Sequence, residues 1–594
     1  MKQLLSGNAA VALGAYHGGI RVAAAYPGTP STEILEHYAA YPGIYAEWSP
    51  NEKVALDVAI GAAYAGANAM AVMKHVGLNV AADPLFYCSY TGVPGSLVIV
   101  TADDPGMHSS QNEQDNRNYA KFARLPMLEP SDSQEAYDFV QQAMELSHQF
   151  ETPVLLRLTT RVCHSYTVVD EPTGEEALPP PPPAEPHPWP RDMRRYVMVP
   201  GNARRRHPII EQRLRDLAAW AETTALNRVE PGDKAVGIIT GGIAYQYAKE
   251  VLPGASFLKL GMSYPLPRCK IQEFAASVDQ VVVVEDLDPF WEEQVRLMGV
   301  DCLGKLDGEL FPLCGEFSPA VVRAGLARAG FLPPPVELPD VTGTLPPLPP
   351  RPPVLCPGCP HRGVFHVLKK LKLVVFGDIG CYTLGVTPPL SIIDTCGCMG
   401  AGIGQLHGAQ EAGLAERAVA VIGDSTFFHT GVPALVNTAY NKGADLVIIM
   451  DNRITAMTGH QEHPGTGYTL QREETVAIDP ANIARAMGIQ HVTVVNPHDI
   501  EATEAAIRAG LDAGEPAVVI TQAPCALRIP PQPALVIDPE RCNGCGLCLR
   551  IGCPALYRVS DDEVRINPLL CTGCTVCQQV CARQAIKLDE ERNT

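Results

Sequence analysis

The last 53 residues contain the densest group of reactive side chains in the chain, eight cysteines in two regular runs. These are Cys542, Cys545, Cys548, Cys553, Cys571, Cys574, Cys577 and Cys581. Thiolates bind iron, and a two-residue spacing lets a tight turn direct three sulfurs at one cubane while the fourth ligand comes from the other run. The spacing therefore predicts two [4Fe–4S] clusters, one on Cys542, Cys545, Cys548 and Cys581 and the other on Cys571, Cys574, Cys577 and Cys553.

This cysteine-rich tail resembles the bacterial two-cluster ferredoxins, with two departures. Four residues precede Cys553 where three are usual, and no proline follows Cys581. The extra residue could bulge one loop and shift the potential of that cluster. A zinc site is the alternative, but zinc sites rarely use two consecutive runs of this kind.

A second candidate site follows two apolar runs, 418–422 and 446–450, which are typical of buried strands. Gly423-Asp424-Ser425 comes directly after the first run, and Asp451-Asn452 comes directly after the second. Ligands of α/β sheets bind beyond the carboxyl ends of the strands. We therefore expect the two segments to meet at one ligand site.

The side chains of these two segments suit a hard cation that bridges to a phosphate. Mg²⁺ prefers oxygen ligands and keeps substrate phosphates among them. We expect Asp424 to supply a carboxylate, Asn452 an amide oxygen and Ile454 a backbone carbonyl. Gly423 lets the backbone approach the phosphate closely.

The pattern resembles the thiamine diphosphate signature, G-D-G followed some 25 to 30 residues later by N-N, with Ser425 and Asp451 as variants. Any two strand–helix loops could produce a bare G-D-S and D-N. The flanking segments 394–404 and 458–461, however, also resemble the diphosphate domains of thiamine-dependent 2-oxoacid enzymes. This resemblance implies that Met399, next to Gly400, supports the aminopyrimidine ring of the cofactor. Ordinary core packing is the alternative for Met399.

Thiamine enzymes also need a glutamate at N1′ of the aminopyrimidine, and Glu52 is the candidate. The segment 49–52, Ser-Pro-Asn-Glu, equally fits a capping box with proline at the first helical position. The upstream segment 26–32, YPGTPST, resembles the Y-P-x-T-P-S-S segment of 2-oxoacid:ferredoxin oxidoreductases, in which the threonine contacts substrate. This resemblance implies catalytic roles for Glu52 and Thr29, and the cap can coexist with the first of them.

Two further features have both functional and ordinary interpretations. His108 lies in a polar loop after a buried strand, where it could touch substrate or simply be a satisfied loop histidine. A basic stretch could hold the phosphates of coenzyme A, or could be a solvated face or an interdomain contact. Its members are Arg191, Arg194, Arg195, Arg204, Arg205 and Arg206.

A third iron–sulfur cluster is predicted outside the tail, on Cys356, Cys359, Cys381 and Cys525. Related pyruvate:ferredoxin oxidoreductases hold a cluster near thiamine with a C-x2-C pair, a third cysteine some 25 residues on and a distant fourth, and these positions match that pattern. Alternatively, these cysteines could pack as small buried hydrophobic residues, or Cys396 or Cys398 could be a ligand in place of one of them. A third cluster would also be unnecessary if a mobile tail accepted electrons directly from the substrate site.

These sites need domains to position them, and proline marks the boundaries. The chain has 54 prolines, about twice the average share, concentrated at 178–190 and 332–353, with a weaker break at 528–533. Proline runs cannot continue helices or central strands, so these stretches are read as linkers. The predicted domains are 1–177 (pyrimidine-binding), 191–332 (transketolase C-terminal-like), 354–528 (diphosphate-binding) and 534–594 (ferredoxin type).

The fold class is predicted to be multidomain α/β. In the first three domains, continuous Val/Ile runs alternate with amphipathic stretches, which indicates parallel strands buried on both faces. The 594 residues are 46% hydrophobic and 19% charged, with a net charge of −19. These values exclude overall disorder and argue against nucleic-acid binding. There is no apolar run long enough for a membrane span and no signal-peptide pattern, so we expect a cytoplasmic protein.

The domain order is similar to the alpha subunits of the indolepyruvate ferredoxin oxidoreductase family. That resemblance implies a small beta subunit, in a heterodimer or a dimer of heterodimers, together with an aromatic 2-oxoacid, coenzyme A and ferredoxin. It also implies oxidative decarboxylation to acyl-CoA. A non-oxidative thiamine decarboxylase would not explain eight ferredoxin cysteines, and an electron-transfer scaffold would not explain the thiamine motifs.

Overall fold

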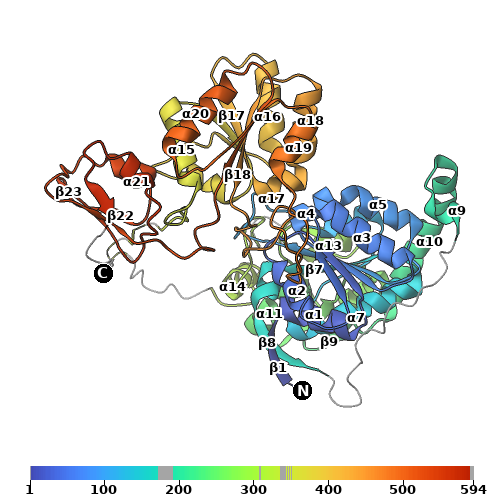
Figure 1. The fold of residues 1–594 in the computed structure, drawn as a ribbon. Helices are drawn as coiled ribbons and strands as arrows, with labels where there is room; N and C mark the ends of the chain where they lie inside the picture. Colours follow the sequence, from blue (N-terminus) through green and yellow to red (C-terminus); the bar gives the residue numbers. More distant parts are fainter. Residues whose placement is uncertain are drawn as a thin grey trace. The chain divides into compact units, whose positions relative to one another are not determined.

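The computed structural model describes residues 2–171, 191–306, 310–334 and 351–588 and positions 343, 346, 348 and 349. The chain forms two compact units, residues 1–345 and 346–594; in Figure 1 the first runs from blue to green and the second from yellow to red. The proline-rich stretch 178–190 and most of 332–353 lie outside the described residues. Within the described ranges, no helix is both long and apolar enough to cross a membrane.

The first unit contains a seven-stranded sheet in which only β12 runs antiparallel to its neighbour. Its order is β12 (Met262–Tyr264), β6 (Met127–Leu128), β7 (Val154–Thr159), β5 (Leu97–Asp103), β4 (Ala69–Lys74), β2 (Val22–Ala25) and β3 (Tyr45–Trp48). Every residue of β5 and β7 is buried. The predicted parallel strands, buried on both faces, are confirmed here.

Helices cover this sheet, and a small antiparallel pair, β1 (Lys2–Ser6) with β8 (Tyr166–Asp170), lies beside it. The helices are α1 (Gly7–His17), α2 (Thr32–Tyr38), α3 (Glu52–Tyr64), α4 (His75–Val80), α5 (Ala82–Thr91), α6 (Arg117–Ala123), α7 (Ser133–Phe150) and α8 (Thr160–His164). The chain goes from β2 out to β3 and then returns past β2 to β4. The carboxyl ends of β2 and β4 therefore form a topological switch point, the usual ligand position in such sheets.

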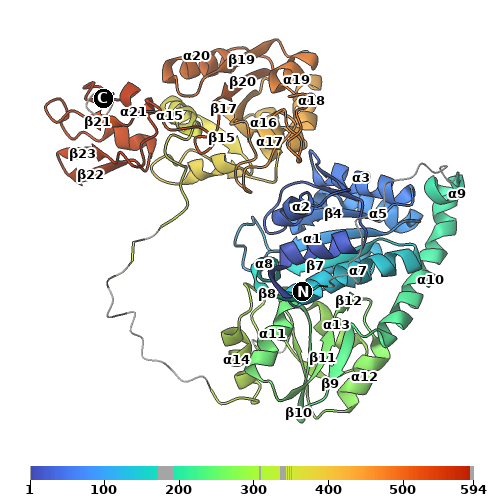
Figure 2. The same cartoon turned by 60° about the horizontal axis from the view of Figure 1, so that its bottom comes forward.

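A second, five-stranded sheet of the first unit has the order β14 (Cys302–Leu303), β13 (Val281–Val284), β10 (Asp233–Thr240), β11 (Ala255–Leu260) and β9 (Asn227–Glu230). Its helices are α9 (Met193–Tyr196), α10 (Pro200–Thr223), α11 (Gly242–Val251), α12 (Arg268–Ala276), α13 (Phe290–Leu297) and α14 (Pro319–Arg328). Figure 2 shows the long helix α10 extending from the side of α5 to α12. One strand of this part of the chain, β12, joins the seven-stranded sheet, and the division into four domains stays a prediction.

The second unit is built on a six-stranded, all-parallel sheet. Its order is β16 (Thr395–Cys396), β15 (Val374–Gly377), β17 (Ala418–Gly423), β18 (Leu446–Asp451), β20 (Ala517–Gln522) and β19 (His491–Val495). Figure 1 shows α15 (His361–Leu371) and α20 (Ile500–Leu511) on one face, and α16 (Ala401–Glu411), α18 (Val432–Tyr440) and α19 (Pro480–Ala486) on the other. The chain reverses between β15 and β17, so their carboxyl ends form a second switch point.

The cysteine-rich tail, which is the last part of the second unit, consists of short elements that pack on the six-stranded sheet domain. They are β21 (Leu535–Ile537), η5 (Leu547–Ile551), β22 (Leu556–Ser560), β23 (Glu563–Ile566), α21 (Val576–Gln579) and β24 (Ile586–Leu588). Ile551 and Val576 are part of the same buried core as α15, α20 and the sheet. Gln579 accepts the N–H of Ile500 at 3.0 Å and donates to the carbonyl of His498 at 2.6 Å. The tail is therefore held on the sheet by apolar and polar contacts.

Candidate active site and iron–sulfur sites

Asp424 lies at the switch point of the six-stranded sheet, where the short helix α17 (Asp424–Thr426) begins directly after β17. Its Oδ1 accepts the N–H of Ser425 at 2.9 Å, and its Oδ2 accepts the N–H of Arg453 at 2.8 Å and contacts His463 Nε2 at 3.1 Å. Burial opposes ionisation, but His463 and these donors hold the pKa of Asp424 below its ordinary value. The residue is thus a buried carboxylate directed at the turn after β18.

The predicted cation ligands converge on that turn. Arg453 N donates both to Asp424 and, at 3.0 Å, to Asp451 Oδ1, so the two carboxylates lie side by side. Asn452 Oδ1 accepts the N–H of Ile454 at 3.2 Å in the same turn. Two neighbouring buried carboxylates and an amide oxygen are donors that a hard divalent cation takes. The residues present therefore fit Mg²⁺.

Asp378 lies on the other side of the same switch point, directly after β15. Asp378 accepts the N–H of Gly400 at 2.9 Å and the hydroxyl of Tyr382. Gly400 has a φ of +84°, and a Cβ added there would lie 2.4 Å from Thr430 Oγ1, so only glycine fits. Met399 beside it is only half-buried and joins neither core of the sheet, which argues against core packing as its role. Sequence reasoning missed Asp378, although it lies in the GDIGCYTLG segment.

The helix after Asp424 contains a π-helical turn, η4 (Phe427–Gly431), before α18 continues. Such turns are rare in proteins as a whole, and many of those that occur lie at functional sites. Thr430, inside the turn, donates to the carbonyl of Met399 at 2.6 Å. The irregular turn thereby brings Thr430 to the segment that carries Met399 and Gly400.

Glu52 begins α3 in the first unit and is 4% exposed. The predicted capping box is wrong, because Asn51 is the N-cap and accepts the N–H of Val54 at 3.0 Å. The capping role therefore belongs to Asn51. Gly77 in α4 packs on Glu52 so closely that an added Cβ would lie 2.8 Å from the glutamate Cγ.

Thr29 lies half-buried at the switch point of the seven-stranded sheet, just after β2. Its carbonyl accepts a long hydrogen bond of 3.4 Å from Ser109 Oγ. Lys74, at the end of β4, donates to the carbonyl of Ser109 at 3.1 Å, and its stem lies against Gly28. Burial lowers the pKa of Lys74, while the nearby carboxylates of Asp104 and Glu52 act in the opposite direction. Thr29, Lys74 and Glu52 thus gather at one end of the sheet.

His108 is exposed and takes part in a polar cluster rather than standing alone. Its Nε2 lies 3.2 Å from Glu316 Oε2, and Arg161 binds the same carboxylate with Nε at 2.9 Å and Nη2 at 2.5 Å. This is the contact expected of a satisfied loop histidine. Its substrate role stays a prediction.

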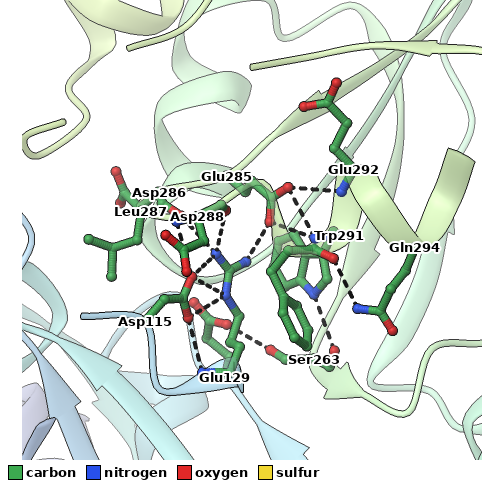
Figure 3. A network of polar contacts seen from close by, with 12 residues as sticks. Asp115, Glu129, Ser263, Glu285, Asp286, Leu287, Asp288, Trp291, Glu292 and Gln294 are labelled. Atoms are coloured by element: carbon green, nitrogen blue, oxygen red, sulfur yellow. Dashed lines mark hydrogen bonds and ion pairs between the residues drawn. The ribbon is translucent and has the colours of Figure 1, made fainter. Parts of the chain in front are cut away.

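A buried ion network joins the two sheets of the first unit (Figure 3). Arg117, 1% exposed, donates to Glu285 Oε2 at 2.6 Å and to both oxygens of Asp115 at 2.9 and 3.0 Å. Glu285 also accepts the N–H of Trp291, whose Nε1 donates to the carbonyl of Ser263 at 3.2 Å. Breaking a buried pair costs about 3–5 kcal/mol, so the network rigidly anchors the polar loop that follows β5.

Two arginines of the basic stretch contact helix α5 within the first unit. Arg195 Nε donates to the carbonyl of Thr91 at 3.0 Å, and Arg206 Nε donates to the carbonyl of Tyr90 at 2.8 Å. Both carbonyls lie at the carboxyl end of α5, where cations are favourable. Arg195 and Arg206 are therefore occupied in capping this helix.

Two cavities in the described part of the tail each contain one of the predicted ligand sets. One cavity is lined by Cys542, Cys545, Cys548 and Cys581. The other is lined by Cys553, Cys571, Cys574 and Cys577, together with Cys359 from the segment before α15. Among the described residues, no three His, Cys, Asp or Glu side chains lie close enough to bind one metal ion. A [4Fe–4S] cubane does not need such a site, because its four cysteine sulfurs are spaced around the whole cluster. The cavities thus fit one cubane each, and in each a cysteine of one run completes the other run's set.

The four cysteines predicted for a third cluster influence one another electrostatically. Burial raises the pKa of Cys359 to about 12, and the Cys381 and Cys356 thiols act in the same direction. Burial, with Cys525, Cys356 and Asp424 acting in the same direction, raises the pKa of Cys381 to about 11. Cys381 and Cys525 therefore lie within electrostatic range of Asp424, and a bound metal would favour the thiolate form that the raised pKa values of Cys359 and Cys381 oppose.

Comparison with known proteins agrees with this geometry. Residues 13–213 match the pyruvate flavodoxin/ferredoxin oxidoreductase thiamine diphosphate-binding family, residues 378–521 the C-terminal TPP-binding domain of thiamine pyrophosphate enzymes, and residues 534–582 the 4Fe-4S dicluster domain. The chain is 41% identical to the indolepyruvate oxidoreductase subunit IorA of Archaeoglobus fulgidus, over 99% of this chain and 97% of that protein. This chain belongs to the IorA family of indolepyruvate oxidoreductase subunits.

Other members of the family are similarly close. The IorA of Methanothermobacter thermautotrophicus is 41% identical over 99% of this chain and 97% of its own length. That of Pyrococcus horikoshii is 40% identical over 98% and 96%. The predicted fold class is confirmed, and the chain is an oxidoreductase subunit with thiamine diphosphate-binding and 4Fe-4S dicluster domains. The zinc alternative and both alternative functions are therefore set aside.

Proposed function

We propose that this chain is the catalytic subunit of an enzyme that oxidatively decarboxylates aromatic 2-oxoacids of the indolepyruvate class to acyl-CoA, CO₂ and reduced ferredoxin. One observation supports this most directly: the chain combines the Asp424 site at a switch point with two four-cysteine cavities. A non-oxidative decarboxylase needs only the first, and an electron carrier needs only the second. The names of the relatives support the substrate class.

Thiamine diphosphate, when bound, supplies a nucleophilic carbon and an electron sink for decarboxylation. Asp424, Asn452 and the Ile454 carbonyl would hold Mg²⁺ and with it the diphosphate. Asp424 and Asn452 already meet at the turn after β18.

Further residues would contact the cofactor. Gly423 and Ser425 would let the backbone approach the diphosphate, while Met399, next to Gly400, would support the aminopyrimidine. Glu52 would hold the proton at N1′ of that ring, which is general acid–base work.

Thr29 and His108 would contact the 2-oxoacid. Thr29 lies at the switch point of its sheet, where such a ligand is expected. His108 is exposed on the loop that the buried network anchors.

Electrons would leave through [4Fe–4S] clusters on the two four-cysteine sets of the tail, and a third cluster would occupy Cys356, Cys359, Cys381 and Cys525. The nearness of Cys381 to Asp424 supports this third position. A small beta subunit, coenzyme A and ferredoxin would complete the cytoplasmic enzyme.

The test is anaerobic co-purification with the small subunit, followed by ferredoxin reduction with indolepyruvate, phenylpyruvate, oxoglutarate and pyruvate, each with and without coenzyme A. We expect the two aryl substrates to have the highest kcat/KM and to require coenzyme A. Release of an aldehyde without ferredoxin reduction would instead indicate a simple decarboxylase. A preference for pyruvate or oxoglutarate would overturn the substrate class.

A further inference from the structure

Arg362 is a buried cation of the second unit to which the proposed chemistry assigns no role. It lies in the first turn of α15, three residues after Cys359, and is 3% exposed. Its Nε donates to the carbonyl of Cys356 at 3.0 Å, and its Nη2 donates to the carbonyl of Leu355. Half of the guanidinium is thus bound to the backbone around the first cysteine of the third set.

The other half of the same guanidinium is bound to the cysteine-rich tail. Nη1 donates to the carbonyl of Gly552 at 2.6 Å and to that of Ile551 at 3.2 Å. These two residues directly precede Cys553. Because the guanidinium is a rigid planar fork, it fixes the backbone beside Cys356 relative to the backbone beside Cys553.

The backbone is shaped to permit this approach. Gly552 has a φ of +70°, and a Cβ added there would lie 3.3 Å from Arg362 Nη1. Gly358 has a φ of +68°, and its added Cβ would lie 1.9 Å from Thr572 Oγ1, on the same side of the tail. Side chains at either glycine would push the tail away from α15.

Arg362 also faces both cysteine sets. It lines the same cavity as Cys359 and the four tail cysteines Cys553, Cys571, Cys574 and Cys577. The thiols that act on it electrostatically are Cys553, Cys359, Cys356 and Cys574. The apolar core at Ile551 and Val576 adjoins this point, and a charge in such a medium acts more strongly than in water.

We propose that Arg362 is a positioning residue for electron transfer. It holds the third cysteine set, which begins at Cys356, against the tail set that contains Cys553 (the Cys553 set), and it raises the reduction potential of the clusters on both sets. This rests on the proposed function, which places a cluster on each set. One electron would pass from the cluster on the third set, which is oxidised, to that on the Cys553 set, which is reduced; no proton moves. A fixed positive charge favours the reduced, more negative state of each cluster.

Two substitutions in the co-purified holoenzyme separate the clamp from the charge. Arg362→Lys keeps a positive charge but loses the planar fork, and Arg362→Met loses both at similar length. Arg550→Met is the matched control, because Arg550 is an exposed cation beside Ile551. The readouts are iron per chain, the cluster potentials from an EPR-monitored dithionite titration, and the rate of cluster reduction after mixing with indolepyruvate.

We expect Arg362→Met to lower the potentials of both clusters, and Arg362→Lys to keep the potentials but slow cluster reduction by roughly tenfold. Arg550→Met should match the wild type in every readout. Unchanged potentials in Arg362→Met, or equal shifts in Arg550→Met, would overturn the proposal. If Arg362→Met loses iron, its potentials cannot be used, and the test then depends on Arg362→Lys. Wild-type potentials together with a wild-type rate of cluster reduction in Arg362→Lys would refute the positioning role of Arg362. Because dithionite reduces the clusters without substrate, the potentials test Arg362 even if the assigned substrate is wrong.

Discussion

Gly77→Ala should move the carboxylate of Glu52 without removing any functional group. The Cβ added at Gly77 would lie 2.6 Å from Glu52 Oε1, 2.8 Å from Cγ and 2.9 Å from Cδ. Carbon atoms prefer about 3.5 Å or more, so the glutamate must withdraw by more than half an ångström. Glu52 is 4% exposed and packed in α3, so it cannot simply turn into solvent.

The size of the effect follows from the role assigned to Glu52. A displacement on the order of 1 Å at a reacting group costs about 100-fold in rate, and general acid–base catalysis supplies about 100- to 10,000-fold. We therefore expect kcat to fall by at least about 100-fold. Alanine is favoured over glycine in a helix by about 0.5–1 kcal/mol, which offsets part of the strain, so unfolding temperature should change little.

The assay measures ferredoxin reduction, thiamine diphosphate occupancy and the rate of deuterium exchange at C2 of bound thiamine. Exchange should slow with kcat while occupancy stays normal, because proton transfer and not binding is affected. Gly61→Ala is the control: Gly61 also lies in α3, and its added Cβ would meet no atom within 4 Å. That variant should keep full activity. Normal kcat and normal exchange in Gly77→Ala would show that Glu52 does not hold the proton.

Four further substitutions test the remaining assignments. Glu52→Gln should fold, bind the cofactor and lose about 100-fold or more in turnover, because Asn51 and not Glu52 caps the helix; near-normal turnover would remove Glu52 from catalysis. Asn51→Ala should cost about 1 kcal/mol of stability but retain turnover once folded, and a thermal melt paired with the assay checks both. Asp424→Ala should lose thiamine diphosphate and activity together, so normal occupancy in a cofactor assay would contradict the Mg²⁺ site. The wild type should contain about twelve irons per chain, and Cys359→Ala about eight; eight irons in both would place all the metal in the tail.

Local sequence patterns were sufficient for the strands and for the positions of the motifs. The runs at 418–422 and 446–450 form β17 and β18, and Asp424 and Asn452 follow them as expected. A continuous Val/Ile run is buried wherever its strand lies in a two-sided sheet, so neighbouring residues alone carry that signal. The regular cysteine spacing likewise predicted the two sets that line the tail cavities.

The helix cap at Asn51 shows where local pattern fails. Ser49 and Asn51 are both good N-caps, and the choice depends on which backbone is extended at the helix start. Asn51 has that conformation, with φ −158° and ψ 172°, and Ser49 instead donates to Glu47 at 2.7 Å. The capping box was therefore a plausible prediction that the backbone path excluded.

By itself, the sequence determined the residue types, their spacing and the order of the domains, because these depend on neighbours along the chain. Only the tertiary structure decided which distant groups meet. His463 reaches Asp424 across 39 positions, Arg362 reaches Gly552 across 190, and Gly77 packs on Glu52 from another helix. Such pairs leave no periodic signal, because a side-chain contact depends on where the folded elements place two residues and not on their separation in sequence. The reactive groups of this protein can therefore be predicted from its sequence, whereas the residues that hold them in position can be identified only in the folded structure.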